Sequence, residues 1–121
     1  MSAGMPGVEL LIQTALLGEA VDAGPALVFV ADEHMRYIAV NRAACEALGY
    51  EREELLQLHV IDVAREADAP TEYGEMLLTG SRAGAALLTR KDGVTVNFLY
   101  QAAQATVAGM PLYVSIGFVY D

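Results

Sequence analysis

The side chains best suited to chemistry in this chain are one cysteine, Cys45, and two histidines, His34 and His59. A cysteine nucleophile needs a base within hydrogen-bonding reach. His34 falls in a short loop between two predicted strands, and His59 follows a predicted helix; neither spacing matches a cysteine hydrolase. Because a free cysteine commonly behaves as a small buried apolar residue, we expect Cys45 to be structural. We expect the two histidines to be surface or loop residues.

Acidic side chains gather at Glu51, Glu53 and Glu54. Paired carboxylates can act as acid and base only when their environments differ, which requires one of them to be buried. A simpler interpretation is that these glutamates form the solvated side of a short helix, with their negative charge near the helix N-terminus. No His, Cys, Asp or Glu cluster has the short spacing of a zinc site. The sequence therefore predicts no catalytic residue and no metal site.

Composition indicates which partners and which cellular setting this protein can have. The 121 residues carry 7 basic and 16 acidic side chains, a formal charge of -9 that repels nucleic acid and anionic membrane surfaces. One cysteine cannot form an internal disulfide, and no basic stretch precedes the apolar segment near residue 10 as in a signal peptide. That segment is also too short to span a bilayer. We expect a cytoplasmic protein with neither a nucleic-acid nor a membrane partner.

The apolar periodicity predicts the elements that position these side chains. The expected order is a helix, two strands, three short helices and three strands, at 8–21, 26–32, 36–40, 41–49, 51–56, 70–79, 86–90, 94–105 and 111–120. Asn41 is placed to cap the second helix, and Gly49 to end it. The first helix is apolar on two sides and needs two surfaces to pack against. We expect one to be the outer face of the sheet and the other a second copy of the chain, contacted through Leu10, Leu17 and Val21.

This order resembles the PAS sensory-domain family over residues 22–121. The features that carry the resemblance are Asp32, Asn41, Gly49-Tyr50, Glu54-Leu55, Asp62, Gly80 and Lys91-Asp92-Gly93. The resemblance implies an α+β fold: a five-stranded antiparallel sheet whose concave face carries the short helices and often a buried cofactor or metabolite. It also implies that a terminal helix, here residues 1–21, dimerises and relays signal.

Strand alternation predicts which side chains face the concave side. A candidate ligand pocket there contains Phe29, Ala31, Val96, Phe98, Tyr100 and Val119, with Tyr73 and Leu77 from the helix at 70–79. Asn97 and Gln101 fall on the opposite, solvated face. Two interpretations remain open: a tightly packed core without ligand, or a small apolar cavity with tyrosine hydroxyls as polar groups.

The resemblance also lets us ask whether this chain has the residues that bind a cofactor in related proteins. In light-sensing LOV relatives the reactive cysteine follows the Gly-Tyr segment, whereas Cys45 precedes Gly49-Tyr50. The positions of their flavin-binding amides are occupied by Phe98 and Val119, which cannot satisfy the polar edge of the ring. Haem-binding relatives carry a histidine on the helix at 70–79, and this chain has none there. We expect neither flavin nor haem, and a colourless protein.

The resemblance implies a non-catalytic sensory and dimerisation module. Its effector would be a histidine kinase, a cyclic-dinucleotide enzyme or a transcription regulator, as in two-component and related signalling proteins. Asp121 aligns with the aspartate of the family's Asp-x-Thr output motif, so we expect the effector to follow it in a longer protein. The alternative is a stand-alone α+β enzyme or small-molecule carrier that uses the same cavity. Convergent titratable groups on the concave face would favour that alternative.

Overall fold

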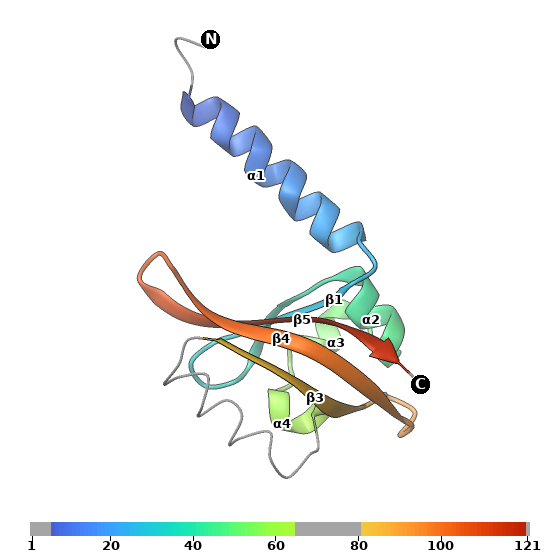
Figure 1. The fold of residues 1–121 in the computed structure, drawn as a ribbon. Coiled ribbons are helices and arrows are strands. Elements are labelled where there is room, and N and C mark those ends of the chain that lie inside the picture. Colours follow the sequence, from blue (N-terminus) through green and yellow to red (C-terminus); the bar gives the residue numbers. More distant parts are fainter. Residues whose placement is uncertain (1–5, 65–80, 121) are drawn as a thin grey trace.

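A five-stranded antiparallel sheet with short helices on one face forms the body of the protein, and one long helix projects from it (Figure 1). The computed structural model describes residues 6–64 and 81–120. The helices are α1 Pro6–Ala23, α2 Arg42–Leu48, α3 Arg52–Leu55 and α4 Val60–Val63, and the strands are β1 Leu27–Ala31, β2 Tyr37–Val40, β3 Ser81–Thr89, β4 Thr95–Val107 and β5 Met110–Tyr120. The strand order is β2-β1-β5-β4-β3, which confirms the predicted fold class.

Most of the predicted elements are confirmed, with two differences among the helices. The short helix α4 was not predicted; its four residues are too few for an apolar period to show. The helix predicted at 70–79, with Tyr73 and Leu77, lies outside the described residues.

Local capping sets both ends of α2, as its sequence predicts. The Asn41 side chain accepts a hydrogen bond from the amide of Ala44 at 3.2 Å. Gly49 has φ +76°, a left-handed conformation that suits glycine, and its amide donates to the carbonyl of Cys45 at 2.8 Å. Cys45 and Tyr50 both pack against the edge of the hydrophobic core, so Cys45 occupies the packing position expected for it.

The core lies between the inner face of the sheet and the helices α2, α3 and α4. Its most deeply buried large side chains are Leu48, Leu55 and Val63, one from each of these helices. Inward-facing strand residues complete it, among them Leu27, Phe29, Ala31, Ala86, Leu88, Phe98, Tyr100, Ala102 and Tyr113. The alternation on β1 and β4 therefore places the same residues inward as the sequence pattern predicts.

The hairpin of β4 and β5 extends beyond its neighbours. β1 pairs with β5 only between Tyr113 and Gly117, and β3 pairs with β4 only as far as Ala103. The rest of the hairpin is a two-stranded ribbon that curls away at the outer side of the sheet (Figure 1). Its turn places Ala108 and Gly109 at positive φ, as a two-residue hairpin turn of the primed type requires.

Helix α1 corrects one expectation. It was expected to cover the outer face of its own sheet, yet it projects away from the sheet and meets the body of the chain at α2 (Figure 1). Leu11, Ile12 and Leu17 are 70, 55 and 67% exposed, so both apolar sides of the helix are uncovered within one chain. The physical reason lies at its C-terminal end, where long-range contacts fix its direction.

Candidate functional site

The inner face of the sheet brings together much of the predicted ligand pocket. The Phe29 ring lies 5.7 Å from Phe98 in an edge-to-face contact, and Phe98 stacks on Tyr100 at 5.5 Å. Tyr37, which the sequence analysis did not select, joins the cluster at 5.5 Å from Phe29. Such ring pairs add to the stability that burial alone provides. Within the described residues these side chains form a packed layer of rings.

The remaining pocket candidates divide into three groups. Ala31 is buried and Val96 packs against the core, as predicted. Val119 pairs with Phe98 across the strands but is 38% exposed, because the pairing of β1 with β5 ends at Gly117 and this end of β5 has no described strand as its neighbour on that side. Tyr73 and Leu77 lie outside the described residues.

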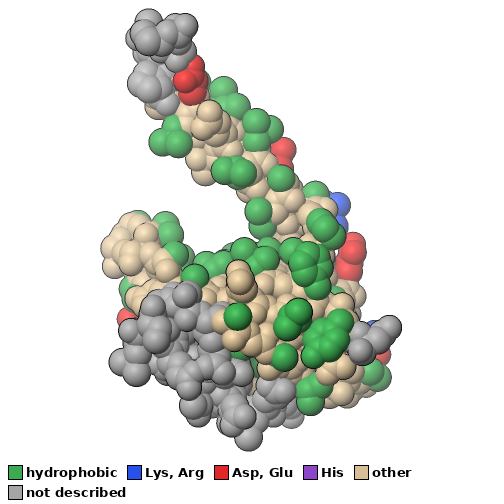
Figure 2. Space-filling model, in the orientation of Figure 1, with side chains coloured by type: hydrophobic (Ala, Val, Ile, Leu, Met, Phe, Trp, Pro, Cys, Tyr) green, Lys and Arg blue, Asp and Glu red, His purple; other side chains and the backbone are tan. Residues whose placement is uncertain are grey.

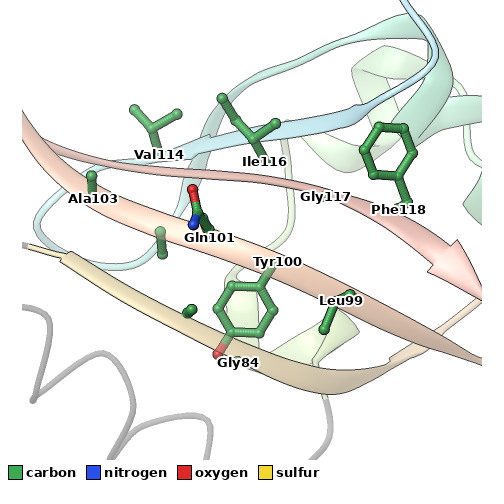
Figure 3. A pocket seen from close by; sticks show the side chains of 11 residues that line it. Gly84, Leu99, Tyr100, Gln101, Ala103, Val114, Ile116, Gly117 and Phe118 are labelled. Atoms are coloured by element: carbon green, nitrogen blue, oxygen red, sulfur yellow. The ribbon is translucent and has the colours of Figure 1, made fainter.

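The Tyr100 side chain takes up the space beside Gly84 on this face. A methyl group built on Gly84 would lie 3.0 Å from the Tyr100 hydroxyl oxygen, so the phenol occupies the room above β3. Figure 3 shows the Tyr100 side chain reaching toward Gly84.

The environment of Cys45 disfavours a thiolate. Burial raises the pKa of the Cys45 thiol above its ordinary value, against the opposing effect of the Arg52 guanidinium. His34 lies beside Glu33 at 3.7 Å, and His59 beside Asp62 at 3.9 Å, both toward solvent. Among residues 6–64 and 81–120, no three His, Cys, Asp or Glu side chains gather as metal ligands would.

The glutamate cluster holds α3 in place. The Glu51 amide donates to the Glu54 carboxylate at 2.9 Å, and the Lys91 ammonium donates to the same carboxylate at 2.6 Å. These hydrogen bonds, that of Lys91 first, lower the pKa of Glu54 below its ordinary value. The Lys91 amide also donates to the Leu48 carbonyl at 2.9 Å. Glu54 thus ties α3 to the β3–β4 turn, and its lowered pKa is the opposite of what a general acid needs.

One concave surface of the described chain lies on the outer face of the sheet. We call it the outer groove, a shallow hollow of about 840 Å³ lined by Ala83, Gly84, Leu99, Tyr100, Gln101, Ala102, Ala103, Val114, Ile116, Gly117 and Phe118. Val114, Ile116 and Phe118 rise from β5 on the same side of the sheet (Figure 3). Leu99 and Phe118 are 59 and 54% exposed. None of the lining residues is charged.

Sequence reasoning placed Gln101 on this outer face, and the structure confirms that it is exposed there. It did not identify the groove, although the signal was present. The same alternation that directs Phe98 and Tyr100 inward directs Leu99 outward, and Ile116 and Phe118 follow the same pattern on β5.

A second set of contacts, which we call the junction, joins α1 to the body of the chain. The buried Asn41 side chain donates to the carbonyls of Val21 at 2.8 Å and Ala26 at 2.7 Å, and accepts from the amide of Val28 at 2.9 Å. Arg52 and Asp22 form an ion pair at 2.6 Å. Asn41 was predicted only as a helix cap, since nothing local indicates that its amide reaches 20 residues back along the chain.

The outer groove, α1 and the junction together form the candidate functional site, and its character is that of an interaction surface. Figure 2 shows hydrophobic side chains along the length of α1 and on the body below it. Apolar patches of this extent on monomeric proteins mark sites of association. No helix of the described residues is both long and apolar enough to cross a membrane.

Comparison with known proteins gives a consistent result. A family model described as PAS domain matches residues 25–121. No curated protein sequence matches the chain. A PAS domain from a two-component sensor histidine kinase superposes with a TM-score of 0.81 at 12% identity, covering 92% of this chain and 99% of that one. The PAS domain of an HTR-like protein from Haloarcula marismortui gives 0.75 at 22% identity, covering 93 and 97%.

A larger protein contains the same architecture. The chain matches an RNA-binding Light-Oxygen-Voltage receptor with a TM-score of 0.76 at 15% identity, covering 98% of this chain and 35% of that one. At these identities the likeness shows a shared fold and says nothing of a shared ligand.

Proposed function

This chain belongs to the PAS domain family, and we propose that it is a dimerising sensory module that passes a signal to an effector domain. PAS domains of sensor kinases are signalling modules and are in general not catalytic. The effector we propose is a histidine kinase, a cyclic-dinucleotide enzyme or a transcription regulator. We further propose a cytoplasmic setting, supported by the single free cysteine.

One observation carries the proposal of a homodimer. Leu10, Leu17 and Val21 lie on one side of α1 and are 63, 67 and 45% exposed. With Thr14 they follow a spacing of four, three and four residues, the repeat with which two helices pack along a shared seam. A second α1 fits this seam, and such pairing would link the two sensory bodies.

The proposed module carries neither flavin nor haem. Phe98 occupies a flavin-amide position of LOV relatives, and it is 3% exposed among aromatic rings. Neighbouring rings on the described part of the inner face lie 5.5 to 5.7 Å apart. The proposal rests on association and signal transfer, and a small apolar ligand on the inner face stays a prediction.

Light scattering coupled to gel filtration tests the proposal. At tens of micromolar the intact chain should have the mass of two copies, and the chain lacking residues 1–21 should be a monomer or an aggregate. An absorption scan of the same sample should show no visible band. A monomeric intact chain would overturn the dimerisation module, and a flavin or Soret band would overturn the absence of these cofactors.

A further inference from the structure

The side chain of Asn41 lies where α1, β1 and α2 meet, and it is 4% exposed. Its Nδ2 group donates to the carbonyl of Val21 on α1 at 2.8 Å and to that of Ala26 at 2.7 Å. Its Oδ1 atom accepts from the amide of Val28 on β1 at 2.9 Å and from that of Ala44 on α2 at 3.2 Å. A primary amide has two donor hydrogens and two acceptor lone pairs. These hydrogen bonds therefore use the full capacity of the group.

A saturated buried amide couples the elements that it joins. With no donor or acceptor to spare, Asn41 cannot exchange one partner for another when α2 shifts. Either the end of α1 moves with α2, or a buried polar group loses its partner, which costs free energy. The main chain of Asn41 strengthens the link, because its amide donates to the Val28 carbonyl at 3.1 Å and its carbonyl accepts from the Cys45 amide at 3.2 Å.

The loop between α1 and β1 is too short to absorb such a shift. It has three residues, 24–26, and the first of them, Gly24, donates to the Val21 carbonyl at 3.3 Å. A methyl group built on Gly24 would lie 2.8 Å from the Ala20 carbonyl oxygen, so the chain turns tightly against the end of the helix. Pro25 restricts the backbone further, because its ring fixes φ. A displacement at the end of α1 is therefore passed to the whole helix.

Helix α2 connects this junction to the inner face of the sheet. Ala44 and Leu48 of α2 are fully buried in the hydrophobic core. At the other end of α2, the Leu48 carbonyl accepts from the Lys91 amide at 2.9 Å, in the turn between β3 and β4. The helix is thus held at one end by Asn41 and at the other by this turn. A change in the packing of the inner face would act on α2 and, through Asn41, on α1.

Helix α1 would enlarge a small change at its base. It has 18 residues and is about 27 Å long, and it stands away from the sheet (Figure 1). A tilt of about 10° at the junction would move the far end of such a helix by about 5 Å. The ion pair of Asp22 with Arg52 adds a second contact at the base. Because this pair is partly exposed to solvent, the buried amide contributes the larger share of the link.

We propose that Asn41 is the positioning residue that couples the packing of the inner face to the direction of α1. The same amide caps α2 and holds α1, so neither helix can move at this point without the other. This inference rests on the proposed function, because it states how a signal from the sensory body reaches the helix. It requires no contact between two copies, so it applies to each chain separately.

The variant Asn41→Asp separates the two tasks of this side chain. A carboxylate keeps two acceptor oxygens and caps a helix as well as an amide does. It has no hydrogen to donate to the carbonyls of Val21 and Ala26, so the cap of α2 is kept while the hold on α1 is lost. Asn97→Asp on the outer face is the matched control, because it makes the same chemical change away from the junction.

Spin labels on the full chain report the direction of α1. They are placed at Glu9→Cys near the start of the helix and at Glu53→Cys on α3, both exposed, in chains that carry Cys45→Ala. Dilution with unlabelled chains restricts the measured distances to pairs within one chain. With Asn41 the distance distribution should have one narrow peak. With Asn41→Asp it should be at least about twice as wide or shift by about 5 Å or more, and Asn97→Asp should leave it unchanged. An unchanged distribution in Asn41→Asp would overturn the coupling.

Hydrogen exchange of the unmodified chain gives a second test, which does not depend on the folding of a variant. The amides of Gly24, Val28 and Ala44 lie on three sides of the junction. They should share one opening free energy, because the saturated amide makes them open in one event. A lower opening free energy for Gly24 than for Ala44 would overturn the coupling.

Light scattering on the same sample keeps the two proposals apart. A dimer in which these amides open independently would overturn the coupling and leave the proposed function standing. A monomer in which they open together would defeat the proposed dimer and leave the coupling in place.

Discussion

The two faces of the sheet differ in solvent exposure, as adjacent residues of one strand show. On β4, Phe98 and Tyr100 point inward and are 3 and 9% exposed, whereas Leu99 between them points outward and is 59% exposed. The inner face is covered by α2, α3 and α4 of the same chain (Figure 1). The outer face also carries apolar side chains, among them Leu99, Ile116 and Phe118, but no described element of its own chain covers them.

This difference separates folding from association. Side chains on the inner face are buried whenever the chain folds, so they stabilise the monomer. Those on the outer face stay exposed in the folded chain, so their apolar area is available for binding. Substitutions on the inner face should therefore change the free energy of unfolding, and substitutions on the outer face should change the dissociation constant of the proposed dimer.

The largest expected effect is loss of the central ring of the inner face. Phe98→Ala should lower the free energy of unfolding by about 3–5 kcal/mol, because it leaves a cavity between Phe29 and Tyr100. Leu99→Ala, its neighbour on the outer face, should change it by less than about 1 kcal/mol. Denaturant titration at a concentration too low for association measures both. Equal losses for the two variants would contradict the division between the faces.

The next effect concerns the buried amide that joins α1 to the body. Asn41→Ala removes four hydrogen bonds and leaves the carbonyls of Val21 and Ala26 without this donor. We expect the free energy of unfolding to fall by about 2–3 kcal/mol. The control is Asn97→Ala on the outer face, expected to change it by less than about 0.5 kcal/mol. If Asn41→Ala behaves like its control, the junction does not hold the helix.

A charge on the outer face should act on association alone. Ile116→Glu places a carboxylate in the outer groove at a side chain that is 45% exposed, and should weaken the dimer at least about tenfold, or ~1.4 kcal/mol, without lowering monomer stability. The matched control is Ile61→Glu on α4, where Ile61 is 63% exposed and is not part of the groove. Sedimentation equilibrium measures both dissociation constants. Equal weakening by the two variants would point to net charge, and no weakening would remove the groove from the interface.

The smallest effect is expected for the ion pair of Glu54 and Lys91, which holds α3 over the inner face of the sheet. Lys91 lowers the pKa of Glu54 below its ordinary value of 4.5. The stability from this pair is therefore present above pH ~4.5 and is lost as the pH falls through the still lower pKa of the folded state. Glu54→Gln and Lys91→Met should each flatten the acid limb of the stability curve. The double variant should flatten it no further than either single one; additive effects would show that the pair does not act as a unit.

Much of the fold could be predicted from residues that lie close together in the sequence. Asn41 and Gly49 mark the ends of α2 because capping depends on residues within one turn. The inward positions of Phe29, Phe98 and Tyr100 follow from the period of a strand, which holds wherever the strand lies. The exposure of Val119 could not be predicted in this way, since it depends on where the pairing of β1 with β5 ends.

The sequence by itself determined most of the elements, the two-sided apolar character of α1 and the two faces of each strand, because these properties depend on residues a few positions apart. Only the tertiary structure decided that α1 projects from its own sheet. That direction is set by contacts across 20 and 30 residues, from Asn41 to Val21 and from Arg52 to Asp22. Likewise, the outer groove exists only because β4 and β5 lie side by side and no other described element covers them. Long-range contacts of this kind leave no periodic pattern in the chain, so they become visible only when the fold brings the residues together.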